Sequence, residues 1–196
     1  MNRRLISMGI CLAFLVAGFN VVFGKKKPEK PALDQFEANI SPPMGNFSTI
    51  SIVLEEYSTP EEVHGLADIF AKGKQDALDN ALGKMKKGFF RYGGAMGMPI
   101  MMVEQKTEPG FRRLTIAGKA LDTVNTEFGG QTIIGHRGYP YTCIEIDVND
   151  QGQGKGTLIP FANLVFNQAG RIVAKPMSSL SGNSQAVQLL KVHSVK

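Results

Sequence analysis

The chain has 196 residues, a formal net charge of +5 and two cysteines. Six basic residues and one acidic residue precede Pro31, and 16 residues of each sign remain from there onward. The part of the chain that is expected to fold is therefore neutral, which gives no support to nucleic-acid binding. Its length of about 150 residues predicts one domain with its own core.

Residues 1–24 are predicted to be a secretory signal peptide. Arg3 and Arg4 precede a nearly uncharged run from Leu5 to Phe23. Positive charge followed by an apolar core of this length is typical of a signal for export, with cleavage after Gly24. The alternative is that the run stays uncut as an anchor, because about 19 apolar residues just span a bilayer. We expect a secreted or periplasmic protein, with membrane contact only through this segment if it is retained.

Residues 25–46 are predicted to be a linker. They contain four prolines and four lysines among polar neighbours, and they show no sustained hydrophobic period. Such a composition favours extended or disordered chain. The globular domain is then expected to span residues 47–196.

The domain is predicted to begin with a strand over residues 47–57 (FSTISIVLEEY). Ile50, Ile52 and Leu54 occupy alternate positions in this stretch, and β-branched residues are dense. Alternation of this kind indicates a strand with one buried face.

Residues 58–85 are the helical part of the chain. Thr59 can accept a backbone N–H at a helix start, Pro60 suits the first helical position, and Glu62 completes a capping box. Two apolar stripes follow, one made of Val63, Leu66, Ala67 and Phe70 and the other of Leu78, Ala81, Leu82 and Met85. Because Gly73 lies between the stripes, two helices are favoured over one, and we expect them to cover the sheet.

Further strands are predicted over residues 88–92, 98–106 and 111–116. The last two of these are joined by Glu108-Pro109-Gly110, which predicts a hairpin turn. The following stretch, residues 118–139, is rich in glycine and has no clean period, although residues 132–134 form a candidate short strand.

The C-terminal part is predicted to consist of four strands, over residues 141–148, 155–166, 171–175 and 186–192. Pro160 lies inside the second of these, which indicates an edge strand or a bulge. All these elements together predict the α+β class. We expect an antiparallel, meander-like sheet of about six to eight strands, with the helical segment packed on one face.

Two glycine-rich or acidic motifs fall in the turn after residue 148. Asp147 to Gly152 looks like the opening of a calcium loop, but Leu158 stands where the last acidic ligand would be needed. Gly152, Gly154 and Gly156 look like a phosphate loop, but no helix is predicted after them. Both motifs are therefore interpreted as one hairpin turn.

Sulfur chemistry provides two more candidates. Met96, Met98, Met101 and Met102 are a possible copper(I) site, because soft thioethers select this ion. Packing is favoured over metal binding, because alternate strand positions would separate these side chains. Cys143 is expected to be a buried, unreactive thiol, because the charges of neighbouring carboxylates oppose thiolate formation. We expect neither a metal nor another cofactor.

The loop over residues 118–139 is the best candidate for a ligand site. It is long, and it carries polar and aromatic side chains, of which Phe128, His136, Arg137 and Tyr139 are the candidate ligand-binding residues. No catalytic residue is assigned in this loop or elsewhere. A secreted hydrolase that uses this loop with His136 remains the alternative.

Two stretches resemble a family of small exported bacterial proteins of uncharacterised function. They are FSTISIVLEEYSTPEEVHGLADIFAKGKQDALDNALGKM and YPYTCIEIDVNDQGQGKGTL, and the resemblance covers most of residues 47–165. It implies a secreted, one-domain protein and transfers no catalytic or binding residue.

The sequence therefore leads to the hypothesis of an exported, non-catalytic binding or scaffold domain of the bacterial cell envelope. This hypothesis rests on two features of the sequence. Helix-capping and turn residues mark the element boundaries clearly, and no catalytic motif is found. The expected partner is an unknown envelope component or a small apolar ligand. A copper-binding protein and a hydrolase are the alternatives.

Overall fold

The computed structural model describes residues 31–44, 47–120, 126–128, 131–133, 138–176 and 186–195. The predicted signal peptide, residues 1–24, lies outside these ranges. No helix within them is long and apolar enough to cross a membrane.

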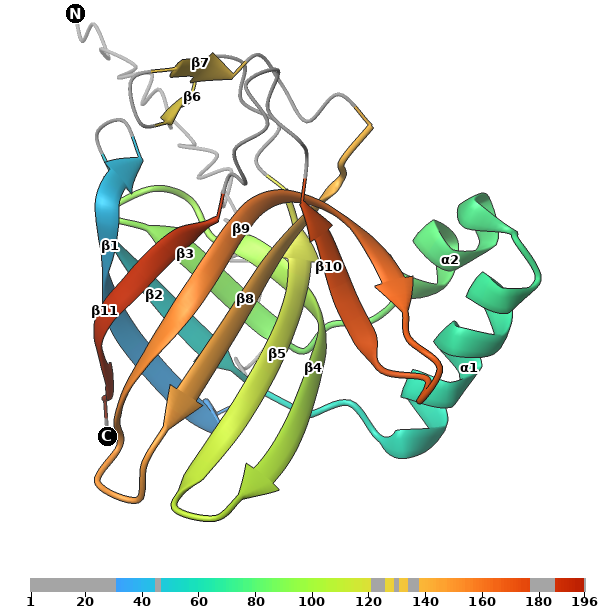
Figure 1. Ribbon diagram of the computed structural model, residues 1–196, viewed down its shortest axis with the longest axis horizontal. Coiled ribbons are helices and arrows are strands. Elements are labelled where there is room, and N and C mark those ends of the chain that lie inside the picture. Colours follow the sequence, from blue (N-terminus) through green and yellow to red (C-terminus); the bar gives the residue numbers. More distant parts are fainter. Residues whose placement is uncertain are drawn as a thin grey trace, which may run out of the picture.

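Eight strands form a closed antiparallel barrel (Figure 1). In their order around the barrel they are β1 (Asp34–Met44), β2 (Phe47–Leu54), β3 (Gly88–Tyr92), β4 (Met98–Glu108), β5 (Phe111–Lys119), β8 (Tyr141–Val148), β9 (Gln153–Phe166) and β11 (Val187–Ser194). Each strand pairs with the next, and β11 pairs with β1 to close the ring.

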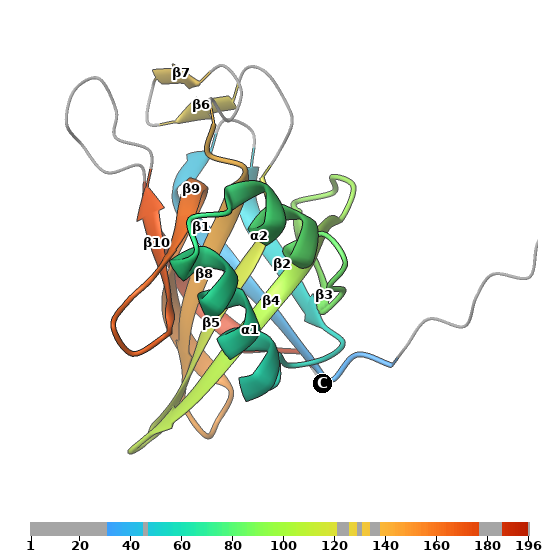
Figure 2. The same cartoon turned by 90° about the vertical axis from the view of Figure 1, so that its right-hand side faces the viewer.

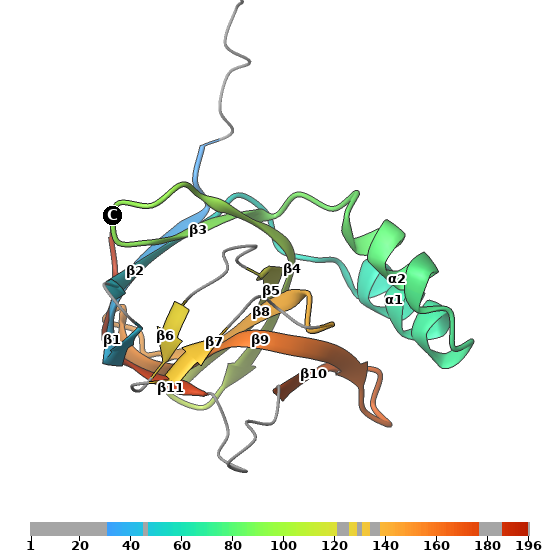
Figure 3. The ribbon, with the colours of Figure 1, turned by 90° about the horizontal axis from the view of Figure 1, so that it is seen from above.

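Three short strands lie outside this ring. β10 (Ile172–Pro176) pairs with the second half of β9. β6 (Thr126–Phe128) and β7 (Gln131–Ile133) pair with each other, and β6 also pairs antiparallel with the last residue of β1, Phe128 with Met44. Seen from above, this hairpin lies across one end of the barrel (Figure 3).

The prediction of an open α+β sheet with helices on one face is wrong. The strands do follow one another in the expected meander, but the first and last strands of the chain are paired, so the sheet closes on itself. Residues 34–44, inside the predicted linker, form β1 instead. Phe36, Ala38 and Ile40 are buried at alternate positions of this strand, so it contributes one face to the barrel interior.

The barrel interior is filled by apolar side chains from all eight strands. Its largest members include Phe36, Met44, Ile52, Phe90, Tyr92, Ile100, Ile116, Ile144, Phe161 and Leu189, all of them no more than 1% exposed. An eight-stranded barrel has an interior just wide enough to be filled in this way or to hold one small ligand.

The two predicted helices are confirmed, but they lie outside the barrel (Figure 2). They are α1 (Pro60–Ala71) and α2 (Gln75–Leu82), and Gly73 between them has a φ of 66°. Their apolar stripes form a second cluster with the outer faces of β4, β5, β8, β9 and β10; its members include Leu66, Leu78, Leu82, Met102, Tyr141, Leu164 and Ile172. The helices therefore cover one outer wall of the barrel.

The predicted capping box at the start of α1 is also confirmed. The Thr59 hydroxyl accepts the Glu62 N–H at 3.2 Å, and the Glu62 carboxylate accepts the Thr59 N–H at 2.8 Å. We expect Thr59→Ala to lower the free energy of unfolding by about 1 kcal/mol, because an N-terminal backbone donor loses its acceptor. Urea denaturation measures this change. Thr59→Ser keeps the oxygen and should retain most of the stability; equal losses in both variants would contradict the capping role.

Two shifts in strand pairing direct parts of the barrel wall towards the helices. The pairing of β4 with β5 shifts between Ile100 and Met102, so that both Met101 and Met102 face the outer cluster. The predicted bulge at Pro160 is confirmed by a shift in the pairing of β8 with β9, opposite this residue. β9 pairs with β11 up to Leu158 and with β10 from Ala162 onward. The bend at Pro160 thus turns the end of β9 away from the ring and towards α1.

Candidate functional site

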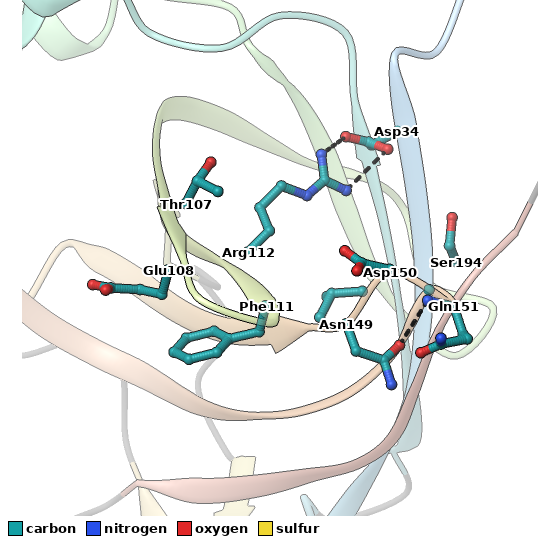
Figure 4. A pocket seen from close by; sticks show the side chains of 11 residues that line it. Asp34, Thr107, Glu108, Phe111, Arg112, Asn149, Asp150, Gln151 and Ser194 are labelled. Carbon is teal, nitrogen blue, oxygen red and sulfur yellow. Dashed lines mark hydrogen bonds and ion pairs between the residues drawn. The ribbon is translucent and has the colours of Figure 1, made fainter.

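The two ends of the barrel differ in chemistry. We call the lower end in Figure 1 the base; it carries the β4–β5 and β8–β9 turns, the start of β1 and the end of β11. We call the opposite end the rim. A pocket of about 690 Å³ lies at the base (Figure 4). It is lined by Asp34, Thr107, Glu108, Phe111, Arg112, Val148, Asn149, Asp150, Gln151, Gly152 and Ser194. This basal pocket has a volume in the range of small-molecule sites.

An ion pair between Arg112 and Asp34 forms one wall of the basal pocket. Nη1 of Arg112 lies 2.8 Å from Oδ2 of Asp34, and Nη2 lies 3.4 Å from Oδ1. Nη1 also donates to the Tyr57 hydroxyl at 2.8 Å, and this hydroxyl donates to Asp34. Burial, followed by the hydrogen bond to Asp34, raises the pKa of Tyr57 well above its usual value. The phenol is therefore neutral and helps to fix the ion pair.

Arg112 is held in place, but not all of its N–H donors are used by the described residues. Its guanidinium lies 5.9 Å from the ring centroid of Phe36, and its side chain is 30% exposed. A guanidinium has five N–H donors, and the described contacts to Asp34 and Tyr57 use three of them. Two donors are thus left for a ligand, as far as the described residues go.

The β8–β9 turn forms the opposite wall. Oδ1 of Asn149 accepts the backbone N–H groups of Gln151 at 3.1 Å and Gln153 at 2.9 Å, so its side chain fixes the turn from within. The predicted hairpin turn is therefore confirmed. Figure 4 shows the Asp150 side chain at the tip of this turn, between Asn149 and the Arg112–Asp34 pair. Asp150 forms no ion pair with any described residue.

A buried lysine supports the chain segment that carries Tyr57. The side chain of Lys87, just before β3, is 3% exposed, and its Nζ lies 2.8 Å from both Glu56 Oε1 and Glu62 Oε2. Burial lowers the pKa of Lys87, but the hydrogen bonds to Glu56 and Glu62 outweigh it and raise the pKa overall. Lys87 therefore connects the start of α1 to the base of the barrel. Its two partners, Glu56 and Glu62, lie before and after Tyr57 in the sequence.

Two of the four residues predicted for the loop site, Phe128 and Tyr139, lie at the other end of the barrel, the rim. Phe128 belongs to β6, which pairs with the last residue of β1. Tyr139 is half-buried and packs against the interior core. His136 and Arg137 lie outside the described residues. The structure thus places Phe128 and Tyr139 at the rim and brings neither of them to the basal pocket.

The sulfur-containing residues lie in separate environments. Met96 is 87% exposed, Met98 packs against the interior core, and Met101 and Met102 belong to the outer cluster. This separation favours packing over a shared metal site. Cys143 is buried as expected, and burial together with the nearby Glu145 raises its pKa to about 12. Its thiol is therefore protonated at neutral pH. No group of three or more His, Cys, Asp or Glu side chains within the described ranges could hold a metal ion.

No local pattern in the sequence indicates the basal pocket. Asp34, Tyr57, Arg112 and Asp150 belong to four separate segments, and Asp34 lies in the predicted linker. Only the barrel closure brings them together. The residue that could have been noticed is Tyr57, because it ends the strand predicted over residues 47–57 and lies two residues before the helix cap Thr59.

The protein is a closed antiparallel barrel with a polar pocket at its base and two helices on its outer wall. No protein-family model, curated protein or solved structure matches this chain. The resemblance to exported bacterial proteins stays a prediction.

Proposed function

We propose that this protein is a non-catalytic binding domain, exported to the cell envelope, whose ligand occupies the basal pocket. The observation that carries the proposal is Arg112, which Asp34 and Tyr57 hold in place inside a pocket of about 690 Å³. An arginine fixed in advance loses little conformational entropy when it binds, so its free donors favour association.

The lining of the pocket favours a neutral, polyhydroxylated ligand such as a small saccharide. Arg112 only donates hydrogen bonds, whereas the carboxylates of Glu108 and Asp150 only accept them. Lys106 lowers the pKa of Glu108, so this carboxylate is ionised at neutral pH. A hydroxyl group both donates and accepts, so one saccharide can satisfy both kinds of partner. An anionic ligand would be repelled by Asp150, and an apolar ligand would leave these groups without partners.

The chemistry of the described side chains supports binding over catalysis. The phenol of Tyr57 is held in its neutral form, and the thiol of Cys143 is buried in the outer cluster, away from the basal pocket. Neither is an activated nucleophile.

We expect Arg112→Gln to weaken saccharide binding at least tenfold, because charge-assisted hydrogen bonds to the ligand are lost. The ligand is sought by ligand-observed NMR with a panel of neutral mono- and disaccharides, and its affinity is then measured by calorimetry. The matched control is Arg113→Gln. Arg113 is the next residue of β5 and pairs with Asp147 at 2.7 Å on the outer wall.

The control variant loses an arginine–aspartate pair of similar geometry but should bind the saccharide normally. Asp150→Asn tests the opposite wall without breaking an ion pair among the described residues, and we expect it to bind several times more weakly. Equal losses in the Arg112 and Arg113 variants, or no binding of any saccharide to the native protein, would refute the proposed ligand class.

A further inference from the structure

The hydroxyl of Tyr92 is a buried polar group that lies outside the basal pocket. Tyr92 is the last residue of β3, is fully buried and points into the barrel interior. Its hydroxyl oxygen has no hydrogen-bond partner among the described residues. A buried polar group without a partner has lost its hydrogen bonds to water and gained none in return. Because such a group lowers the stability of the fold, it is a candidate for a functional role.

The surroundings of this phenol are aromatic and apolar. The ring of Phe47 lies 5.6 Å from that of Tyr92, and the ring of Phe90 lies 5.5 Å away in an edge-on arrangement. Burial raises the pKa of Tyr92 well above its usual value, and an interaction with the Thr142 hydroxyl partly offsets this rise, although the two hydroxyls form no hydrogen bond of normal geometry. The Thr142 hydroxyl itself donates to the carbonyl oxygen of Pro160 at 2.9 Å. The phenol therefore remains a neutral donor.

Tyr92 lies at the rim, where half-buried apolar side chains surround the barrel end. Phe47 is the first residue of β2, Met98 is the first residue of β4, and Tyr139 precedes β8. All three pack against the interior core and remain partly exposed. The rim thus combines an apolar border with one buried, unused hydrogen-bond donor. This arrangement is the reverse of the basal pocket, which is polar and open.

We propose that Tyr92 is the polar anchor of a second binding site, at the rim, for an uncharged amphipathic molecule. The ligand's apolar body contacts Phe47, Met98 and Tyr139, and one carbonyl oxygen, such as that of an ester or a ketone, accepts the hydrogen bond of the phenol. A carboxylate fits less well, because burying a charge requires an opposite charge. The positive groups nearest in sequence do not supply one, since Arg91 stacks on the ring of Phe89, 4.5 Å from its centroid. The site is independent of the basal pocket.

The experiment compares two buried tyrosines with different hydroxyl environments. Tyr141 is also buried, but it lies in the outer cluster and its hydroxyl donates to Asp79. Tyr92→Phe and Tyr141→Phe each remove one oxygen atom. The probe is prodan, an uncharged naphthyl ketone whose fluorescence moves to shorter wavelengths in apolar surroundings and to longer ones when its carbonyl accepts a hydrogen bond.

We expect the native protein to bind prodan, and Tyr92→Phe to bind it about tenfold more weakly and with emission at shorter wavelengths. Without ligand, Tyr92→Phe should unfold at the same temperature as the native protein or higher, because it removes an unsatisfied group. Tyr141→Phe should do the opposite, with a lower unfolding temperature and unchanged prodan binding. Arg112→Gln should also bind prodan normally, which separates this site from the basal pocket.

Three results would overturn the proposal. One is that prodan does not bind the native protein. The second is that Tyr92→Phe binds prodan as tightly as the native protein does. The third is that Tyr92→Phe loses as much thermal stability as Tyr141→Phe, which would show that the Tyr92 hydroxyl already has a partner.

Discussion

Replacing Lys87 by alanine is expected to lower the free energy of unfolding by about 3 kcal/mol. The change removes the hydrogen bonds of Nζ to Glu56 and Glu62 and leaves a hole where the buried aliphatic stem packs. The two carboxylates are partly exposed, so water solvates them after the change and limits the loss. Chemical denaturation with urea measures the difference.

The variant Lys87→Met separates charge from packing. Methionine fills much of the volume of the lysine stem but cannot bind the two glutamates, so we expect about half of the loss. A loss below about 1 kcal/mol for the alanine variant, as for an exposed ion pair, would contradict a structural role of Lys87.

The pH dependence provides an independent check. Because the pKa of Lys87 is raised in the folded protein, its contribution is complete below the pKa of unfolded lysine, about 10.4, and is lost as the pH rises through the higher folded value. Tyr57, Tyr92 and Tyr141 also have raised pKa values and destabilise the fold above about pH 10. The difference between the native protein and Lys87→Met isolates the lysine. This difference should shrink above about pH 10.4.

Replacing Gly156 by alanine is the second large expected effect, again a loss of about 3 kcal/mol. A Cβ atom at this position would lie 2.3 Å from the carbonyl oxygen of Glu145 and 2.7 Å from a methyl group of Ile146. At Gly154 it would lie 1.9 Å from the carbonyl oxygen of Asp147. Both glycines lie where β9 pairs with β8 on one side and β11 on the other. A displaced β9 would therefore disturb its pairing with β8 and with β11, the strand that links β9 to β1 and so closes the barrel.

Gly65 offers the matched control for this glycine substitution. It lies inside α1, and nothing lies within 4 Å of a Cβ atom built there. Gly65→Ala should raise the free energy of unfolding by up to about 1 kcal/mol, because alanine favours the helix. Thermal unfolding of both variants, followed by circular dichroism, tests the contrast. An unchanged stability of Gly156→Ala would show that the close approach of the two strands is not required.

The local elements were predictable because their signals are local. Thr59, Pro60 and Glu62 lie within four consecutive residues and mark the start of α1, and Gly73 marks the break before α2. The alternation of Ile50, Ile52 and Leu54 likewise identifies a strand without any knowledge of its neighbours.

The closure of the barrel was not predictable in this way. Alternation shows which face of a strand is buried, but it does not show whether an edge strand has a partner. Phe36, Ala38 and Ile40 do alternate, yet the prolines at positions 42 and 43 indicated a linker. In the structure these prolines lie where the pairing of β1 with β2 is interrupted, between Asn39 and Met44, so the strand tolerates them. The basal pocket was missed for the same reason, because it includes Asp34 of β1.

The seam between β1 and β11 also constrains how the molecule can be made. Phe36, near the start of the domain, pairs with Ser194, near its end, and the N–H of Val195 donates to the carbonyl oxygen of Gln35 at 2.8 Å. A nascent chain therefore cannot complete the ring until the residues of β11 have been synthesised. Until then β1 and β9 each expose an unpaired edge, which is prone to aggregate. Pairing of strands so distant in sequence is also slow. Closure of the ring by β11 is therefore expected to be a late and slow step of folding.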